Sequence, residues 1–377
     1  MGRLPRWARW NATRPDYTVG IEEELMPLDP GRSWSLDQEF AAVREQLSGA
    51  LADRLESETH AAAVEIATAP HRSAAAAGAE LVVLRRRLAD ELAGEGRAAA
   101  GAGQHPATTW EETELSDEHR YEYVHETMRD LARREPTFAT HVHVAIGDPE
   151  RALDVANRMR AHLPLLLALS ANSPYWQGRD TGLASARTPV FDAFPRTGIP
   201  RTFDGYGDFV ETLETMVACG AFPEPSFIWW DLRLRPASGT IEIRAMDAQS
   251  DAERTASLAA LTQVLVRLED DGGFASDRLT GSHELLSENR FIAARDGVEA
   301  KLLDPDHNGR ITVTELVDRV LERGQGAAHD LDCVAALARL PAMVAEPAHE
   351  LQRELAGPEP DLSGLVAALS ERFSRSP

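Results

Sequence analysis

The chain has 377 residues, 43% of them hydrophobic, and a formal net charge of −22, which argues against a nucleic-acid partner because phosphate backbones require a basic surface. Its two cysteines supply neither a disulfide framework nor a zinc cluster, and the N-terminus lacks the apolar segment of a signal peptide. The longest apolar run, residues 163–171, is too short to span a bilayer, so we expect a cytoplasmic protein with no membrane partner.

The expected elements mix strands and helices in an irregular order. In chain order they are strand 17–30, helix 36–51, strand 60–68, helix 73–94, a short strand after residue 97, helix 121–134, strand 140–147, helices 149–171 and 205–218, strand 240–247 and helix 251–268. The remainder is expected to be mostly helical. Because this order shows no βαβ regularity, no internal repeat and no proline-rich or serine-rich linker, it predicts one α+β domain over residues 1–377 with a mainly antiparallel sheet.

Four of the expected strands carry charged or imidazole groups on one face and aliphatic groups on the other. In the stretch THVHVAIG, His141 and His143 share a face, because side chains at i and i+2 of a strand point the same way. The same alternation places further groups on one face of the other three strands: Glu22 and Glu24 in GIEEEL, Glu65 in AVEIAT, and Glu242 and Arg244 in TIEIRAMD.

Two interpretations of these polar faces are open. Hydrogen bonds at the wet edge of a sheet would explain the two histidines taken alone. A solvated face, however, usually favours Thr, Lys, Ser and Gln, whereas this pattern offers carboxylates, imidazoles and an arginine. Clustered carboxylates repel one another unless a divalent cation neutralises them, and Mg²⁺ or Mn²⁺ suits carboxylates with an occasional imidazole. The pattern therefore predicts a sheet whose concave face holds metal ions.

A long loop, residues 169–200, is dense in Gly, Pro, Ser and Asn, and such a loop in a compact domain is usually functional or disordered. Its aromatic residues argue against disorder. Arginines recur along it and just after it like a set of anion clamps: Arg179, Arg187, Arg196 and Arg201. Some of them are alternatively explained as partners of local acids such as Asp180 and Asp192, so we expect about two of the four to contact substrate.

The segment DPDHNGRITVTE, residues 304–315, matches the calcium loop of an EF-hand. Its ligand positions are filled by Asp304, Asp306, Asn308 and Glu315, and helical sequence is expected on both sides. No second loop is found, although EF-hands usually work in pairs. A turn followed by a helix N-cap at Thr312 or Thr314 explains the same residues more simply. We therefore predict a structural turn that binds calcium no more tightly than millimolar.

Seven segments resemble, in this order, the glutamate–cysteine ligase type 2 family of bacterial and archaeal carboxylate–amine ligases. They are YTVGIEEELMPLDP, AVEIAT, THVHVAIG, ALSANSPYWQGRDTGLASARTPVFDAFPRTGIP, IWWDLRLRP, GTIEIRAMDAQ and ENRFIAARDGVEA. The family motifs occupy about residues 17–320, and residues 321–377 form a helical C-terminal part. The resemblance implies a glutamine-synthetase-like catalytic domain, with a curved, mainly antiparallel sheet and helices packed on its outer face.

The family implies ATP-dependent amide bond formation. ATP phosphorylates a carboxylate, typically the γ-carboxylate of L-glutamate, and the amine of L-cysteine or another amine then displaces phosphate from the acyl phosphate. Divalent ions, Mg²⁺ or Mn²⁺, must neutralise the phosphate charge. The resemblance assigns the metal ligands Glu22, Glu24, Glu58, Glu65, His143 and Glu242. It assigns the catalytic and nucleotide-binding arginines Arg244, Arg187 and Arg179, with His141 as a further nucleotide ligand.

Two other classes of function would use the same residues. A phosphotransferase of the guanidino-kinase kind has a related fold, and a non-catalytic binding protein could have kept it. The intact set of carboxylates, histidines and arginines argues against the binding protein, because a decayed site should lose clustered carboxylates that are costly to keep together. The expected partners are small molecules, and homodimer formation is left open.

Overall fold

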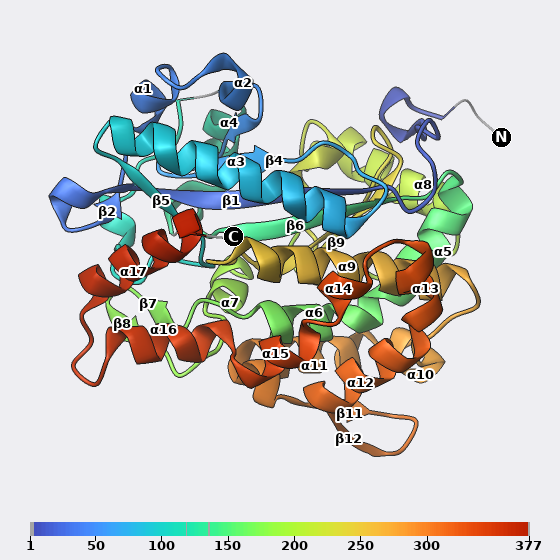
Figure 1. The fold of residues 1–377 in the computed structure, drawn as a ribbon. Coiled ribbons are helices and arrows are strands. Elements are labelled where there is room, and N and C mark those ends of the chain that lie inside the picture. The colour runs from blue at the N-terminus through green and yellow to red at the C-terminus, as the bar shows by residue number, and fades with distance from the viewer. Residues whose placement is uncertain (1–3, 118, 135, 376–377) are drawn as a thin grey trace.

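The computed structural model describes residues 4–117, 119–134 and 136–375. At its centre lies an eight-stranded sheet in the order β3-β4-β1-β6-β10-β9, with the short strands β2 and β5 paired to β1 (Figure 1). Each pairing described in this sheet is antiparallel, which confirms the predicted α+β fold with a mainly antiparallel sheet. The strands are β1 (Val19–Asp29), β2 (Ser35–Leu36), β3 (Leu55–Ser57), β4 (Val64–Ala67), β5 (Ala98–Ala100), β6 (Ala139–Ala145), β9 (Leu232–Arg235) and β10 (Thr240–Asp247).

Two long helices cover the apolar face of this sheet. Helices α3 (Ala74–Gly94) and α9 (Ala252–Asp270) pack against each other and against β1, and α9 also contacts β6 (Figure 1). Gly78 allows this close approach, because a Cβ there would lie 2.4 Å from the Cβ of Ala256. Buried aliphatic side chains of the strands form the core beneath the helices: Ile21, Leu25, Val64, Ile66, Val142, Val144, Ile241 and Ile243.

An ion pair is buried within this apolar layer. Glu23 on β1 and Arg85 on α3 are both fully buried, and Arg85 donates from Nε and Nη2 to the two carboxylate oxygens over 2.7 and 2.6 Å. Thr255 Oγ1 donates to the same carboxylate over 2.6 Å. The ring of Phe373, near the end of α17 (Leu362–Arg375), lies 4.9 Å from Cζ of Arg85. An acid on the aliphatic side of β1 is thus held by partners from two helices, α3 and α9, and a third helix, α17, covers Arg85.

The long loop of residues 169–200 contains short ordered elements. It begins after α6 (Leu163–Ser170), forms a hairpin of β7 (Tyr175–Trp176) and β8 (Arg179–Asp180), and then turns into α7 (Arg187–Phe191). Helix α11 (His283–Asp296) packs against both α6 and α7. The loop is therefore anchored between the sheet and α11.

The remaining helices surround this core, and α13–α17 are the last elements of the described chain. Their bounds are α4 (His119–Met128), α5 (Pro149–Met159), α8 (Tyr206–Ala218), α10 (Asp277–Thr280), α12 (Val313–Arg323), α13 (Gln325–Asp330), α14 (Val334–Leu337), α15 (Leu340–Ala345) and α16 (Ala348–Ala356). Single 3₁₀ turns lie at Arg6–Ala8, Pro30–Arg32, Trp110–Glu112, Arg129–Arg133, Arg160–His162, Pro225–Phe227 and Gly297–Glu299. Within the described residues no helix combines the length and the apolar character needed to cross a membrane.

Two predictions of local structure are wrong. The helix expected over 36–51 is interrupted between α1 (Phe40–Arg44) and α2 (Gly49–Ala52), where Ser48 donates from both N and Oγ to the carboxylate of Glu91. The EF-hand-like segment is not preceded by a helix but lies in a hairpin of β11 (Lys301–Asp304) and β12 (Gly309–Thr312). The predicted N-cap is present, because Thr312 Oγ1 accepts from Glu315 N at the start of α12.

Candidate functional site

The polar faces of four strands come together on the side of the sheet away from α3 and α9. The antiparallel register sets Glu22 opposite His141, Glu24 opposite Glu65, and His143 opposite Glu242. Because the two-residue alternation is in phase over these paired positions, every one of these side chains emerges on the same face. The pairing of β10 with β6 shifts by one residue only beyond them, between Ile243 and Met246. The predicted clustering of the carboxylates and imidazoles on one sheet face is therefore found.

Two groups of three ligand atoms lie close enough to hold a cation. One consists of Glu22, His141 and Glu242, the other of Glu24, Glu65 and His141, and within each group the ligand atoms lie within 4.8 Å of one another. His141 is 1% exposed and shared by both groups, with Nδ1 3.5 Å from Glu22 Oε2 and Nε2 3.5 Å from Glu24 Oε1. The two groups thus form one continuous cluster centred on His141.

The donors in this cluster fit a hard divalent cation. Carboxylate oxygens with an imidazole suit Mg²⁺ or Mn²⁺. The Nε2 atom of His141 is buried and makes no hydrogen bond with any described residue. Burial, together with the charges of Glu22 and two further carboxylates, raises the pKa of Glu65 well above its usual range. A cation would relieve this repulsion and use the unpartnered imidazole nitrogen.

His143 has a different setting from His141. Its Nε2 lies 3.1 Å from Glu22 Oε2 and 3.9 Å from Glu242 Oε1, and its Nδ1 is 3.1 Å from Thr240 Oγ1. It belongs to neither three-atom group, although the resemblance assigned the metal-ligand role to His143 and nucleotide binding to His141. Glu58, also assigned as a metal ligand, follows β3 and belongs to neither group.

Glu242 is fully buried among arginines. Arg233 on β9 donates to both of its oxygens, over 2.5 and 3.1 Å, and Arg244 Nη1 donates over 2.6 Å. Burial alone would raise the pKa of Glu242, but the charges of Arg233 and Arg244 outweigh it and hold this pKa well below its usual range. Arg233 was missed by the sequence analysis, although the Leu-Arg-Leu-Arg alternation of β9 puts it on the polar face.

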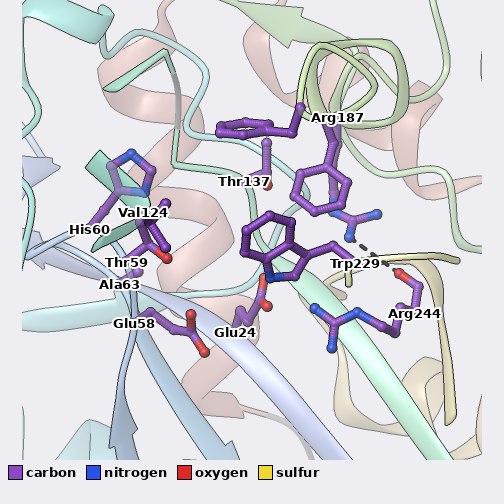
Figure 2. Close-up of a pocket in the computed structure, with 12 residues that line it drawn as sticks. Glu24, Glu58, Thr59, His60, Ala63, Val124, Thr137, Arg187, Trp229 and Arg244 are labelled. Atoms are coloured by element: carbon purple, nitrogen blue, oxygen red, sulfur yellow. Dashed lines mark hydrogen bonds between the residues drawn. The ribbon is translucent and has the colours of Figure 1, made fainter. Parts of the chain in front are cut away.

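A pocket of about 660 Å³, including its open mouth, lies beside the cluster. Figure 2 shows Arg187 and Arg244 on one side of the Trp229 indole, and Glu58, Thr59 and His60 on the other. We call Phe191, Phe194 and Trp229, which all line the pocket, the aromatic wall. The full lining is Glu24, Glu58, Thr59, His60, Ala63, Val124, Thr137, Arg187, Phe191, Phe194, Trp229 and Arg244.

The two arginines of the pocket keep unused hydrogen-bond donors. Arg187 is buried, and its Nη2 donates to the carbonyl oxygen of Arg244 over 3.2 Å while Asp247 Oδ1 lies 3.8 Å from Nη1. The Nε atoms of Arg187 and Arg244 are buried without a hydrogen-bond partner in the described chain. Burial lowers the pKa of Arg187 although Asp247 opposes that shift. These guanidinium groups can therefore bind an anionic substrate group.

The four loop arginines, all of them described, have different positions. Arg187 lines the pocket, whereas Arg179 is exposed on β8, opposite Trp176 and outside the pocket lining. Arg196 stacks behind the aromatic wall, with Cζ 5.0 Å from the Trp229 ring, and Arg201 binds Asp208. The local acids considered as alternative partners pair elsewhere: Asp180 with Arg353 and Asp192 with Arg290.

Comparisons with known proteins agree on one family. A family model described as glutamate–cysteine ligase family 2 matches residues 18–360. A glutamate–cysteine ligase of Natronomonas pharaonis is 36% identical over 312 residues, which are 81% of this chain and 85% of that protein. A Rubrobacter xylanophilus relative with the provisional name glutamate–cysteine ligase 2-1 is 37% identical over 321 residues, 84% of each chain.

A solved structure has the same fold at much lower sequence identity. The glutamate–cysteine ligase of Francisella tularensis in complex with AMP superposes with a TM-score of 0.70 at 13% identity, covering 96% of this chain and 90% of that one. At this identity the likeness concerns the fold alone.

Proposed function

This chain belongs to glutamate–cysteine ligase family 2, and from that premise we propose that it is an ATP-dependent carboxylate–amine ligase that joins the γ-carboxylate of glutamate to a primary amine. The family assignment made from the sequence motifs is thereby confirmed. The name of the family suggests cysteine as the amine. The reaction type rests on the family and on the site chemistry set out below.

One observation carries the proposal: two groups of cation ligands share His141 beside a pocket that holds two guanidinium groups with unused donors. Phosphoryl transfer from ATP needs its negative oxygens neutralised and held in place, and little else from the protein. Carboxylates that hold divalent ions and arginines that bind phosphate oxygens supply both. A binding site for neutral molecules would have no use for this combination.

The donor set supports a Mg²⁺ or Mn²⁺ ion at Glu24, Glu65 and His141 or at Glu22, His141 and Glu242. A neutral imidazole has one free lone pair, so His141 would bind the ion of only one group, and an ion in the other group would be held by its two carboxylates. Bound there, such ions would neutralise the phosphates of ATP and the charge that develops during transfer. This proposal gives the metal-ligand role to His141 in place of His143. It also leaves Glu58 free to face the pocket.

Two exchanges of bonds make up the proposed reaction. An oxygen of the γ-carboxylate bonds to the γ-phosphorus of ATP and ADP leaves. The neutral amine nitrogen then bonds to the acyl carbon, and phosphate leaves with the proton that the nitrogen gives up. Arg187 and Arg244 donate hydrogen bonds to the transferring phosphoryl oxygens. Glu58 accepts a hydrogen bond from the amine, and the aromatic wall keeps water from the acyl phosphate. Arg179 has no part in this scheme because it is exposed outside the pocket.

The test is a ligation assay with purified protein, Mg²⁺-ATP and L-glutamate against a panel of amines that includes L-cysteine. We expect release of one phosphate for each amide formed, with the amide identified by its mass. The Glu242→Gln variant serves as the matched control and should release no phosphate. A stable phosphorylated substrate without amide would favour the guanidino-kinase reading, and no ATP consumption with any amine would favour a binding protein.

A further inference from the structure

The aromatic wall is built from two loop segments rather than from the sheet. Phe191 ends α7 and Phe194 follows it, while Trp229 belongs to the stretch that leads into β9. The two segments run side by side, since Trp229 N donates to Arg196 O and Asp231 N donates to Gly198 O, both over 2.9 Å.

Arg290 on α11 reaches both segments at once. Its Nη1 donates to Asp192 Oδ2 over 2.5 Å, and its Nε and Nη2 donate to the two oxygens of Asp231, the second over 3.1 Å. Asp192 lies directly between the two phenylalanines of the wall, and Asp231 follows Trp229 by two positions. One guanidinium therefore binds an acid beside each part of the aromatic wall.

The second of these acids, Asp231, also connects the aromatic wall to β10. The carbonyl oxygen of Asp231 accepts from Arg244 N over 2.7 Å, so the residue that Arg290 grips is bonded to the backbone of a pocket arginine. Arg290 itself does not line the pocket; it stands behind the wall, on the side away from the substrate. Any effect of Arg290 on the reaction must act through these two segments and not by contact with the substrate.

Packing between the wall and α11 is incomplete. A second cavity of about 600 Å³, including its mouth, lies between the loop after α7 and α11, and its lining includes Thr188, Asp192, Ser287 and Arg290. Because side-chain packing does not fill this gap, the ion pairs span it in place of apolar contacts. Arg290 is 9% exposed and Asp231 4% exposed, so loss of either partner would leave a nearly buried charge uncompensated.

We propose that Arg290 is a positioning residue that ties the two segments of the aromatic wall to α11 and thereby sets the affinity for the amine substrate without touching it. A planar guanidinium is needed because it must serve two carboxylates in one plane with three separate N–H groups. The effect on the amine rests on the proposed ligase function, whereas the tie between the wall and α11 does not.

The test compares Arg290→Lys with Arg295→Lys, a matched control on the same helix whose side chain is exposed and bonds to Asp296. Hydrogen exchange measured by mass spectrometry needs no substrate. In Arg290→Lys we expect about tenfold faster exchange or more in the peptides covering 188–198 and 227–231, with the sheet unchanged, because a point charge cannot hold both acids. Arg295→Lys should match the wild type in every peptide.

Steady-state kinetics test the consequence. We expect the KM for the amine to rise about tenfold or more in Arg290→Lys while kcat at saturation and the KM for ATP change less than about threefold. More phosphate should be released per amide formed, since a displaced wall weakens amine binding and admits water to the acyl phosphate. Asp192→Asn, whose side chain is 39% exposed, should fold normally and give a smaller change of the same kind.

Three results would overturn the proposal. They are wild-type exchange in both segments of Arg290→Lys, faster exchange spread evenly over the chain, and a lowered kcat with an unchanged KM for the amine. If the wild-type protein ligates nothing, the proposed function fails, and the exchange measurement alone still decides whether Arg290 anchors the wall.

Discussion

Arg233 and Arg235 are neighbours on the same face of β9, but only Arg233 donates hydrogen bonds to both carboxylate oxygens of Glu242. Arg233 uses two nitrogens on the two carboxylate oxygens, and its side chain is 11% exposed. The Nε of Arg235 lies 3.7 Å from Glu242 Oε2, and its side chain is 39% exposed. Because Glu242 belongs to one of the cation-ligand groups, its orientation depends on Arg233 far more than on Arg235.

We expect Arg233→Lys to lower kcat about a hundredfold or more, because an ammonium group cannot hold both carboxylate oxygens and Glu242 would lose its fixed orientation. Arg235→Lys on the same strand face should lose less than about tenfold, as an exposed pair contributes little. The ligation assay measures both, with circular dichroism to check folding. Equal losses in the two variants would show that the bidentate contact is not what matters.

At the scale of single residues, the alternation of polar and aliphatic side chains predicted the shared face of Glu22, Glu24, Glu65 and Glu242. That prediction was possible because side chains alternate between the two faces of a strand. Once the aliphatic side chains are buried on one face, the charged ones must point to the other. The same alternation contained Arg233. The place of Trp229 in the pocket could not be predicted. It depends on backbone hydrogen bonds between residues 229–231 and residues 196–198, which are far apart in the sequence.

At the scale of elements, the strand β1 is held from its apolar side by the Glu23–Arg85 pair. Arg85 donates to both oxygens of Glu23 and also to the carbonyl oxygen of Gln249, so β1, α3 and the segment before α9 meet at one point. A shift of β1 by one residue would break this contact and turn Glu22 and Glu24 away from the site. The pair therefore fixes the register of the strand that carries two of the acidic ligands.

We expect Glu23→Gln to lower the free energy of unfolding by about 3–5 kcal/mol, because it leaves the Arg85 charge buried without a partner. The double variant Glu23→Leu with Arg85→Met should recover most of that loss, since apolar residues of similar size often replace buried pairs without cost. Urea unfolding measures both. A double variant as unstable as the single one would mean that packing, not charge, is disturbed.

Sequence patterns were less reliable for short helices and loops. The continuous helix expected over 36–51 fails at Ser48, whose N and Oγ are taken by Glu91 on α3, a contact no local pattern contains. The start of α12 was predictable, because Thr312 and Glu315 form a capping box in which Glu315 Oε2 accepts from Thr312 N over 2.9 Å.

We expect Thr312→Ala to lower the free energy of unfolding by about 1 kcal/mol, the usual cost of losing an N-cap side chain. Glu315→Gln should cost less, since a glutamine at this position can also complete a capping box.

Calorimetry on metal-stripped protein should detect no calcium binding tighter than millimolar. Micromolar binding that disappears in Glu315→Gln would show that the segment is a calcium loop after all.

At the scale of the whole molecule, buried histidines and a buried carboxyl group change the stability with pH in opposite directions. Burial lowers the pKa values of His60, His105 and His349 to about 4, so the stability they contribute is present above pH 6.5 and is lost as the pH falls toward 4. Burial and Glu24 raise the pKa of Glu58 to about 8, so its contribution is present below pH 4.5 and is lost as the pH rises to 8. The two trends oppose each other below pH 6.5.

Between pH 6.5 and 8 the carboxyl trend stands alone. We expect the unfolding free energy of the protein in EDTA to fall by about 1 kcal/mol over this range, because the unfolded state gives up the Glu58 proton that the folded state retains. Glu58→Gln should reduce the fall and leave the part due to Glu65, whose pKa is also raised. Millimolar Mg²⁺ should reduce it as well, whereas Glu56→Gln on the exposed side of β3 should leave it unchanged. Thermal melts across the range measure this, and a slope unaffected by Glu58→Gln would assign it to other groups.

The contact between Phe373 and Arg85 has a consequence for the order of events during synthesis. Glu23 leaves the ribosome early, Arg85 and Thr255 follow, and Phe373 emerges after all of them. Until α17 has been made and docked, the face of Arg85 that Phe373 covers stays open to water. The buried pair that fixes the register of β1 is therefore closed off from solvent only after the C-terminal helix has been translated.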